Sequence, residues 1–207
     1  MTGMPVGILL AAGAGARMGR PKALVRDADG TSWLLRAVAS LLDGGCSPVL
    51  AVLGAEAEAA AEILDEAVRR GDPAVRGDVR RVVALDWREG MGASLRVGLT
   101  HALGLETSGP PPTTACLTLV DLPDVDGRVV RRVVDAAGED AAALARAAYA
   151  GSPGHPVVIG RNHWLFVIEQ ASGDRGARDY LASRPVALVE CGDLATGADI
   201  DSGETSP

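Results

Sequence analysis

A glycine-rich turn with two basic residues follows the first apolar run of the chain, and it is a candidate phosphate-binding loop. The run 6–11 has the length and composition of a buried strand, and it leads directly to Gly13 and Gly15. Glycine lets the backbone turn sharply, so that successive N–H groups can surround an anion. Arg17 and Lys22 add fixed positive charge, one as a planar fork and one as a point charge. The segment is therefore predicted to hold a nucleoside triphosphate.

Two well-known phosphate-binding loops do not match this segment. In a Walker loop a lysine directly follows the last glycine and precedes serine or threonine. Here Arg20 follows Gly19, and Ala23 follows Lys22. A dinucleotide-binding fingerprint needs a third small residue where Met18 stands. The segment indicates another kind of nucleotide site, and the alternative is a glycine-rich turn whose basic side chains are merely solvated.

Acidic residues at two distant places are candidate metal ligands. Asp121 follows the apolar run 115–120, and Mg²⁺ commonly takes one or two carboxylates together with substrate phosphate oxygens. Asp199 and Asp201 flank Ile200, so both carboxylates point to the same side of an extended segment. The alternatives are that Asp121 only terminates a strand and that the C-terminal pair belongs to a solvated acidic tail.

A third polar element lies at the start of the predicted helix 93–103. Gly90 and Gly92 leave backbone N–H groups accessible at the helix entrance, and Ser94 follows them. A serine at such a position more commonly caps the helix, but its hydroxyl can also bind a base or a ribose. The sequence leaves both interpretations open.

The loop over residues 10–22 resembles the signature of the molybdenum cofactor nucleotidyltransferases, L-A-x-G-x-x-x-R-M-G-x-x-K. The cytidylyltransferases of that family carry L-A-A-G, which stands here at residues 10–13, whereas the guanylyltransferases carry glycine at the position of Ala12. One hypothesis is that an Ala12 methyl group lying against the base crowds a purine more than a pyrimidine. The resemblance therefore implies CTP as the nucleotide substrate.

Further elements along the chain are similar to the same family. Residues 86–95 resemble its D-W-x-x-G-M-G-x-S-L element, which implies recognition of the nucleotide base. Residues 154–156 and 173–178 resemble its G-H-P and G-D-x-G-A-R elements. The C-terminal D-I-D-S begins at Asp199, but Gly203 stands where the family has proline. The resemblance thus covers nearly the whole chain.

The resemblance implies a fold, a reaction and partners. The fold is a single-domain, three-layer α/β structure of the Rossmann-like nucleotidyltransferase type, with a mixed, mainly parallel sheet. The reaction is magnesium-dependent transfer of CMP from CTP to the terminal phosphate of molybdopterin, with release of pyrophosphate. A molybdopterin-type cofactor is the implied acceptor, and a molybdoenzyme or its cofactor-insertion chaperone is an implied protein partner.

The resemblance also implies residue roles. Arg17, Lys22 and Asp121 are the predicted catalytic residues, and Asp121, Asp199 and Asp201 are the predicted metal ligands. The predicted nucleotide-binding residues are Leu10, Ala11, Ala12, Gly13, Ala14, Gly15, Ala16, Lys22, Gly90, Gly92 and Ser94. The predicted contacts to the anionic acceptor are His155, Arg175 and Arg178. A structural histidine and ordinary exposed arginines are the alternatives for these last three.

Other functions remain open on the sequence alone. One is GTP-dependent transfer to the same acceptor, or nucleotidyl transfer to another phosphorylated small molecule. A second is an NAD(P)-dependent oxidoreductase, which the incomplete fingerprint disfavours, as does Leu53 leading to Gly54 and Ala55 with no acid directly after the second strand. A third is a non-catalytic carrier or chaperone for a pterin cofactor, which the presence of Lys22 and Asp121 disfavours.

Alternating strand-like and helix-like stretches must position these residues. Strands are predicted over 6–11, 48–53, 81–85, 115–120, 157–159 and 186–189, and helices over 32–42, 56–70, 93–103, 128–137, 164–170 and 177–181. Ser32 is the predicted N-cap of its helix, and the segment 141–148 fits a strand or a helix. In open α/β sheets, ligands bind at the carboxyl ends of strands, where the glycine-rich loop and Asp121 both lie.

Composition limits the class of protein. The 207 residues fit one domain, 1–207, with a surface loop at 107–114 and a polar tail at 192–207. Hydrophobic residues make up 47% and aromatic residues 3%, which predicts an aliphatic core. The net charge of −7 disfavours binding to nucleic acid or an anionic membrane. Without a spanning apolar run or a recognisable signal peptide, a cytoplasmic location is expected.

Overall fold

A seven-stranded sheet forms the centre of the protein. The structure, a computed structural model, describes residues 3–106 and 109–200. The strand order is β3-β2-β1-β4-β6-β5-β7. The strands are β1 (Val6–Ala11), β2 (Val49–Leu53), β3 (Val79–Val83), β4 (Thr114–Leu119), β5 (Leu144–Tyr149), β6 (Ser152–Gly160) and β7 (Ala187–Glu190). Strand β6 runs antiparallel to β4 and β5, and the other neighbouring pairs are parallel. The predicted single-domain α/β fold with a mixed, mainly parallel sheet is confirmed.

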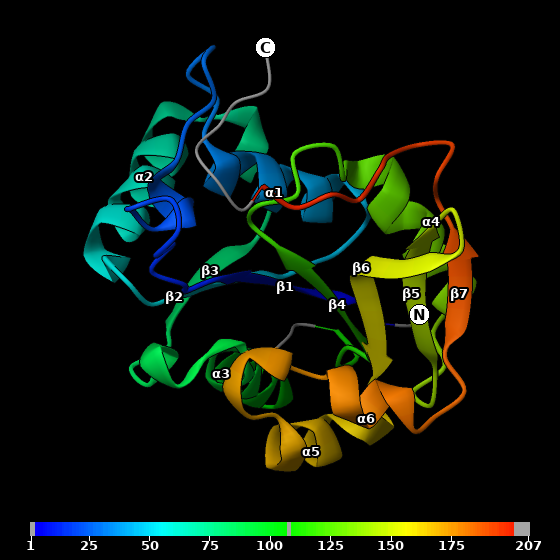
Figure 1. Ribbon diagram of the computed structural model, residues 1–207. Helices are drawn as coiled ribbons and strands as arrows, with labels where there is room; N and C mark the ends of the chain where they lie inside the picture. Colours follow the sequence, from blue (N-terminus) through cyan, green and yellow to red (C-terminus); the bar gives the residue numbers. More distant parts are fainter. Residues whose placement is uncertain (1–2, 107–108, 201–207) are drawn as a thin grey trace.

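Helices cover both faces of this sheet and make three layers (Figure 1). One face carries α1 (Trp33–Asp43), α2 (Ala57–Arg70) and α4 (Gly127–Ala137), and the other carries α3 (Met91–Leu103), α5 (Arg161–Gln170) and α6 (Arg178–Ala182). Each interface has its own aliphatic core. Strand β1 lies between the two cores and is buried along its whole length, which explains why its sequence is a continuous apolar run rather than an alternating one.

Several strand boundaries differ from the sequence prediction, because pairing with neighbouring strands decides where a strand begins and ends. The third strand covers Val79–Val83 rather than 81–85, because it pairs residue by residue with β2, and β2 ends at Leu53. Of the ambiguous segment 141–148, residues 144–148 belong to strand β5, because β6 and β7 pair with its two edges. The short strand predicted at 157–159 is part of the longer β6. Ser32 caps α1 as predicted, accepting a hydrogen bond from the Leu35 N–H at 3.4 Å.

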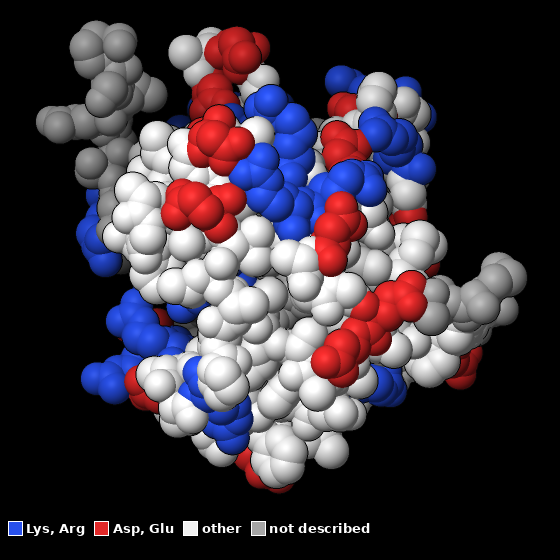
Figure 2. Space-filling model, turned by 90° about the vertical axis from the view of Figure 1, so that its right-hand side faces the viewer, with Lys and Arg blue, Asp and Glu red and all other residues white. Residues whose placement is uncertain are grey.

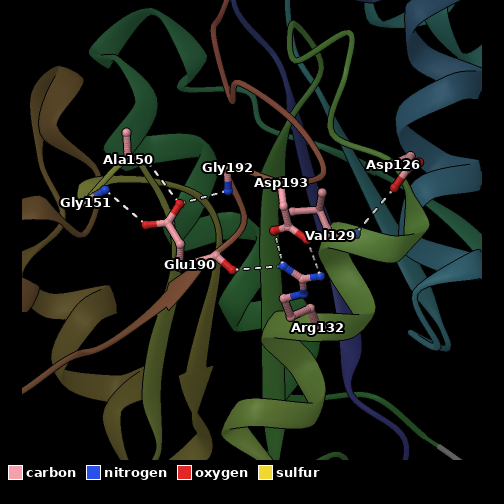
Figure 3. Close-up of polar contacts among 8 residues, drawn as sticks. All are labelled: Asp126, Val129, Arg132, Ala150, Gly151, Glu190, Gly192 and Asp193. Carbon is pink, nitrogen blue, oxygen red and sulfur yellow. Dashed lines mark hydrogen bonds and ion pairs between the residues drawn. The ribbon is translucent and has the colours of Figure 1, made fainter.

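The chain after β7 is held against the sheet and α4 (Figure 3). The Glu190 carboxylate accepts hydrogen bonds from the N–H groups of Gly192 and Gly151, at 2.8 and 3.0 Å, and these bonds lower the pKa of Glu190. Arg132 of α4 forms an ion pair with Asp193 and donates to the Glu190 carbonyl at 3.0 Å. Residues 192–200 contain no helix or strand, yet these contacts direct them back towards the carboxyl end of β4.

Surface features agree with the charge balance of the sequence. On the face that includes the β7 edge, basic and acidic side chains are interspersed rather than gathered into one basic surface (Figure 2). Residues 109–113 of the predicted loop lie outside helices and strands, and Thr114 already belongs to β4. In the part of the chain that the structure describes, no helix has both the length and the apolar character needed to cross a bilayer.

Candidate active site

A cavity of about 510 Å³ opens at the carboxyl ends of β1 and β4. From β1 the chain first builds β2 and β3 on one side and then crosses to β4 on the other side. This reversal of strand order leaves a crevice between the two loops, where ligands of open α/β sheets bind. The cavity is lined by Leu10, Ala11, Ala12, Gly13, Ala14, Gly15, Ala16, Arg17, Lys22, Trp87, Arg88, Gly90, Met91, Ser94, Leu119, Val120, Asp121 and Asp174.

The loop after β1 has a conformation that requires glycine at one position. Gly15 has a φ of +60°, and a Cβ there would lie 2.0 Å from the Arg20 carbonyl oxygen. The Gly15 carbonyl accepts a hydrogen bond from the Met18 N–H at 2.8 Å and closes a tight turn. Residues 12–16 consequently form a curved wall of the cavity, with little side-chain volume. Such a wall lets a ligand approach the backbone closely.

Lys22 and Asp121 meet across the cavity although 99 residues separate them in the sequence. The Lys22 Nζ donates to Asp121 Oδ2 at 2.6 Å, and the two side chains are 17% and 12% exposed. Lys22 begins a short 3-10 turn after the loop, whereas Asp121 lies just beyond the end of β4. The pair therefore exists only because β1 and β4 are neighbours in the sheet.

The second oxygen of Asp121 is a candidate metal ligand. Asp121 Oδ1 is buried and has no hydrogen-bond partner among the described residues. An unsatisfied buried carboxylate oxygen is costly, and a cation would satisfy it. The Ile200 N–H donates to the Asp121 carbonyl at 3.1 Å, so Asp199 lies beside this part of the site. Asp201, the third predicted ligand, lies outside the described residues.

No complete metal cluster is present in the described part of the chain. Within residues 3–106 and 109–200, no group of three histidine, cysteine or acidic side chains is arranged to hold an ion. One or two carboxylates suffice for Mg²⁺ when substrate phosphates supply the remaining oxygens. Asp121 with Asp199 fits that type of site.

The entrance to α3 differs from the prediction. Helix α3 begins at Met91 rather than at residue 93, and Gly90 is its N-cap, with a φ of +109°. Ser94 therefore lies inside the first turn, so of the two interpretations that the sequence left open, helix capping does not apply. Its side chain instead belongs to the cavity wall, where it is available to a ligand. Gly92 does not line the cavity, because it packs against Ser172, whose N atom would lie 2.6 Å from a Cβ at this position.

Three polar or aromatic lining residues were missed as individual site residues. Trp87 and Arg88 follow β3, and the Arg88 guanidinium lies 4.4 Å from the centre of the Trp87 ring. Asp174 reaches the cavity from the short turn that follows α5. All three stand within the elements 86–95 and 173–178 that the sequence had already singled out. Residues of both segments line the cavity, but the motifs do not indicate which of their side chains face it.

The predicted acceptor-binding residues do not line this cavity. Arg175 forms an ion pair with Asp179 at 3.2 Å, and Arg178 is the first residue of α6. His155 lies in β6, and its Nδ1 is buried without a hydrogen-bond partner among the described residues. Burial lowers the pKa of His155 to about 4, and the nearby charge of Arg146 acts in the same direction. The histidine is therefore neutral at physiological pH.

The chain is similar to known proteins in both its sequence and its fold. Residues 7–188 match the MobA-like NTP transferase domain. The nicotine blue oxidoreductase of Paenarthrobacter nicotinovorans is 36% identical, over 96% of this chain and 92% of that protein. The crystal structure of Rv0371c from Mycobacterium tuberculosis H37Rv superposes with a TM-score of 0.64 at 25% identity, covering 98% of this chain and 95% of that chain.

Two further solved structures bear on metal and fold. A complex of the Mycobacterium tuberculosis protein with manganese has a TM-score of 0.63 at 25% identity, covering 97% of this chain and 95% of that chain. A nucleotidyl transferase from Methanothermobacter has a TM-score of 0.71 at 20% identity, covering 96% and 92%. At that identity the second likeness shows the fold alone.

Proposed function

The chain belongs to the MobA-like NTP transferase family, and on that premise we propose that it transfers CMP from CTP to the terminal phosphate of molybdopterin. In this reaction an oxygen of the acceptor phosphate forms a bond to the α-phosphorus, and the bond to the bridging α–β oxygen breaks. The electron pair leaves with pyrophosphate. The observation that carries the proposal is the cavity in which a glycine-rich loop faces the Lys22–Asp121 pair.

The loop and its basic residues are suited to a triphosphate. Backbone N–H groups of residues 12–16 would hold the β- and γ-phosphates, as in other anion-binding turns. Lys22 and Arg17 both line the cavity and would neutralise the charge that moves onto the leaving pyrophosphate. An acceptor phosphate is already ionised at neutral pH, so the protein needs mainly to align it and to stabilise charge.

A divalent cation fits the acidic side of the same cavity. Asp121 would hold Mg²⁺ through its unsatisfied Oδ1, with Asp199 or Asp201 as a further ligand. When bound, the ion would neutralise phosphate charge and help to orient the reacting groups. The manganese complex of the Mycobacterium tuberculosis protein supports a divalent metal in structurally similar proteins.

The choice of CTP depends on the residue at position 12. Ala12 is buried and lines the cavity next to Gly54, where an added Cβ would lie 2.7 Å from the Ala12 Cβ. The wall is therefore closely packed behind Ala12, and the methyl group cannot retreat from a ligand. A pyrimidine leaves it more room than a purine does, which favours CTP over GTP.

The acceptor would approach from the β6 side of Asp121. His155 lies on β6, which is next to β4, and Arg146 lies on β5, the following strand of the sheet. Burial lowers the pKa of the Arg146 guanidinium, and the nearby charge of Arg178 acts in the same direction. A neutral His155 could donate or accept one hydrogen bond there, and Arg178 could pair with an anionic group. Arg175 is less suited, because Asp179 already holds it.

A second candidate function is an oxidoreductase activity. It is favoured by one observation, the 36% identity to a protein named nicotine blue oxidoreductase over nearly the full length of both chains. A dinucleotide cofactor receives less support from the cavity itself. Met18 stands where the fingerprint needs a small residue, and Glu56, the first acid after β2, does not line the cavity.

Two parallel measurements separate the transferase from the oxidoreductase. Pyrophosphate release is measured with CTP, molybdopterin and Mg²⁺, and omission of each component serves as a control. We expect release to require all three and to be lost in Asp121→Asn, which keeps the size of the side chain but removes its charge. NADH and NADPH binding is measured in parallel by fluorescence. Binding of a dinucleotide without any pyrophosphate release from CTP or GTP would contradict the transferase proposal and favour the oxidoreductase.

A further inference from the structure

Asp174 is an unpaired carboxylate in the cavity wall. Among the described residues, the acidic side chains that line the cavity are those of Asp121 and Asp174. Asp121 is paired with Lys22 at 2.6 Å, whereas Asp174 forms no hydrogen bond or ion pair with any residue in the described ranges. Nearby acids are different in this respect, because Asp86 and Glu89 are both bound by Arg96. Asp174 is exposed to solvent in this cavity wall, so its carboxylate is accessible to a ligand.

The turn that carries Asp174 packs closely against the entrance of α3. A Cβ at Gly90 would lie 2.6 Å from Asp174 Oδ1 and 2.6 Å from the Gly173 carbonyl oxygen. A Cβ at Gly92 would lie 2.6 Å from the Ser172 N atom. Residues 172–174 therefore lie directly against two glycines at the entrance of α3, where a larger residue would not fit.

Helix capping does not explain Asp174. An acidic side chain near a helix N-terminus usually accepts hydrogen bonds from the free N–H groups there. The start of α3 has no side-chain cap hydrogen bond, and its N-cap position is occupied by Gly90. The carboxylate is thus placed beside the helix entrance without serving as its cap.

Two groups of residues of different character line the cavity. Residues 13–16, Arg17 and Lys22 are suited to phosphates, and the second group consists of residues that precede or begin α3, together with Asp174. Ala12 lies beside this second group, because a Cβ at Gly54 would lie 2.7 Å from the Cβ atoms of both Ala12 and Trp87. A nucleotide whose triphosphate lies on the loop would direct its base towards α3. The base would then meet Ser94 and a carboxylate that can only accept hydrogen bonds.

We propose that Asp174 is a specificity-determining residue whose carboxylate accepts a hydrogen bond from the 4-amino group of cytosine and rejects the 4-carbonyl of uracil. The proposal rests on the nucleotide-binding role proposed above and deepens it. Cytosine presents an amino donor at this position, and uracil presents a carbonyl acceptor in nearly the same shape. Two acceptors that face each other leave both unpaired, which is costly in a partly desolvated site. Ala12 would then select for size, and Asp174 for the polarity of the base edge.

The test compares two nucleotides that differ at this one position. Dissociation constants of CTP and UTP are measured by calorimetry with Mg²⁺ for the wild type and for Asp174→Asn. An amide of the same size can donate to the uracil carbonyl. We expect the preference for CTP over UTP to fall about tenfold or more in the variant, mainly because UTP binds more tightly. Removal of one negative charge strengthens both triphosphates alike, so it leaves the ratio unchanged.

Asp179→Asn is the matched control, because it makes the same change at an exposed acid of α6 outside the cavity wall. Its CTP-to-UTP ratio should equal that of the wild type. An unchanged ratio in Asp174→Asn overturns the inference, and so does equal weakening of both nucleotides, which indicates a structural role. If the wild type binds neither CTP nor UTP, the proposed function itself fails, which is a different outcome from either of these.

Discussion

At the scale of single residues, Lys22 links the phosphate loop to the acidic side of the cavity. Its ammonium contacts Asp121 at 2.6 Å and lies beside the wall where a triphosphate would bind. We predict that Lys22→Ala lowers kcat by about 100-fold or more, because an electrostatic contact to the developing charge is lost. The free energy of unfolding, measured with urea, should change by a much smaller fraction than kcat does. Near-normal turnover with a normal fold would remove the central role assigned to this lysine.

Ala12 is expected to set the nucleotide preference through its methyl group. In Ala12→Gly the cavity wall recedes by one methyl, so GTP should bind more tightly relative to CTP, by about tenfold. Dissociation constants for both nucleotides measure the ratio. If the ratio of the GTP and CTP dissociation constants is unchanged in Ala12→Gly, the Ala12 methyl group does not select the base by its size.

His155 predicts a specific dependence of stability on pH. Burial lowers its pKa from 6.5 to about 4, an effect that Arg146 reinforces and that a backbone hydrogen bond to Leu117 and the charges of Asp121 and Asp199 partly oppose. Between these two values the unfolded chain binds more protons than the folded one, so acidification destabilises the fold. We predict that the wild type loses about 2 kcal/mol more than His155→Gln between pH 7 and pH 5.

Urea unfolding of both proteins at the two pH values, in metal-free buffer, measures this difference directly. All other titrating groups are common to the two proteins and cancel in the comparison. Parallel pH profiles for the two proteins would show that His155 does not titrate in this way.

At the scale of elements, the contact between α3 and the turn 172–174 shapes the base end of the cavity. We predict that Gly92→Ala destabilises the protein by about 1–3 kcal/mol, because the added Cβ would overlap the Ser172 backbone. It should also weaken CTP and UTP alike, since the whole turn must shift. Gly104→Ala at the other end of α3 is the control, because its nearest neighbours lie 3.9 Å away. Equal stability of the two variants, measured by urea unfolding, would contradict this packing argument.

At the scale of the whole molecule, ligand binding and folding are linked. A ligand that binds only the folded state stabilises it by about 2.7 kcal/mol at about 100 times its Kd. For a chain of this size we predict that CTP with Mg²⁺ at that excess raises Tm by roughly 5–10 °C. Lys22→Ala should show a smaller rise at the same CTP concentration. Differential scanning calorimetry provides the measurement, and no shift in the wild type would argue against a CTP site.

The whole molecule carries a net charge of −7, so binding of an anionic ligand depends on the local arrangement of basic groups. The overall field repels anionic ligands, so a triphosphate must be held by the few basic groups and N–H groups of one cavity. The interspersed charges in Figure 2 agree with this view, because that face offers no extended basic surface for a polyanion.

The sequence by itself determined the local structures and the class of fold. The continuous apolar run of β1, the alternation of strands and helices and the Ser32 cap were all readable, because they depend on residues close together in the chain. The same holds for the glycine-rich turn, whose positive φ at Gly15 only glycine adopts easily. Family membership followed from these local patterns, whereas the base and the acceptor remain proposals.

Only the tertiary structure decided which distant residues meet. Lys22 and Asp121 pair because β1 and β4 are neighbours, and Asp174 enters the cavity because its turn packs on Gly90. It also placed Arg175 outside the cavity and Ser94 within a helix turn rather than at its cap. Strand order and helix packing result from the burial of two cores at once, and short-range sequence patterns carry little information about that choice.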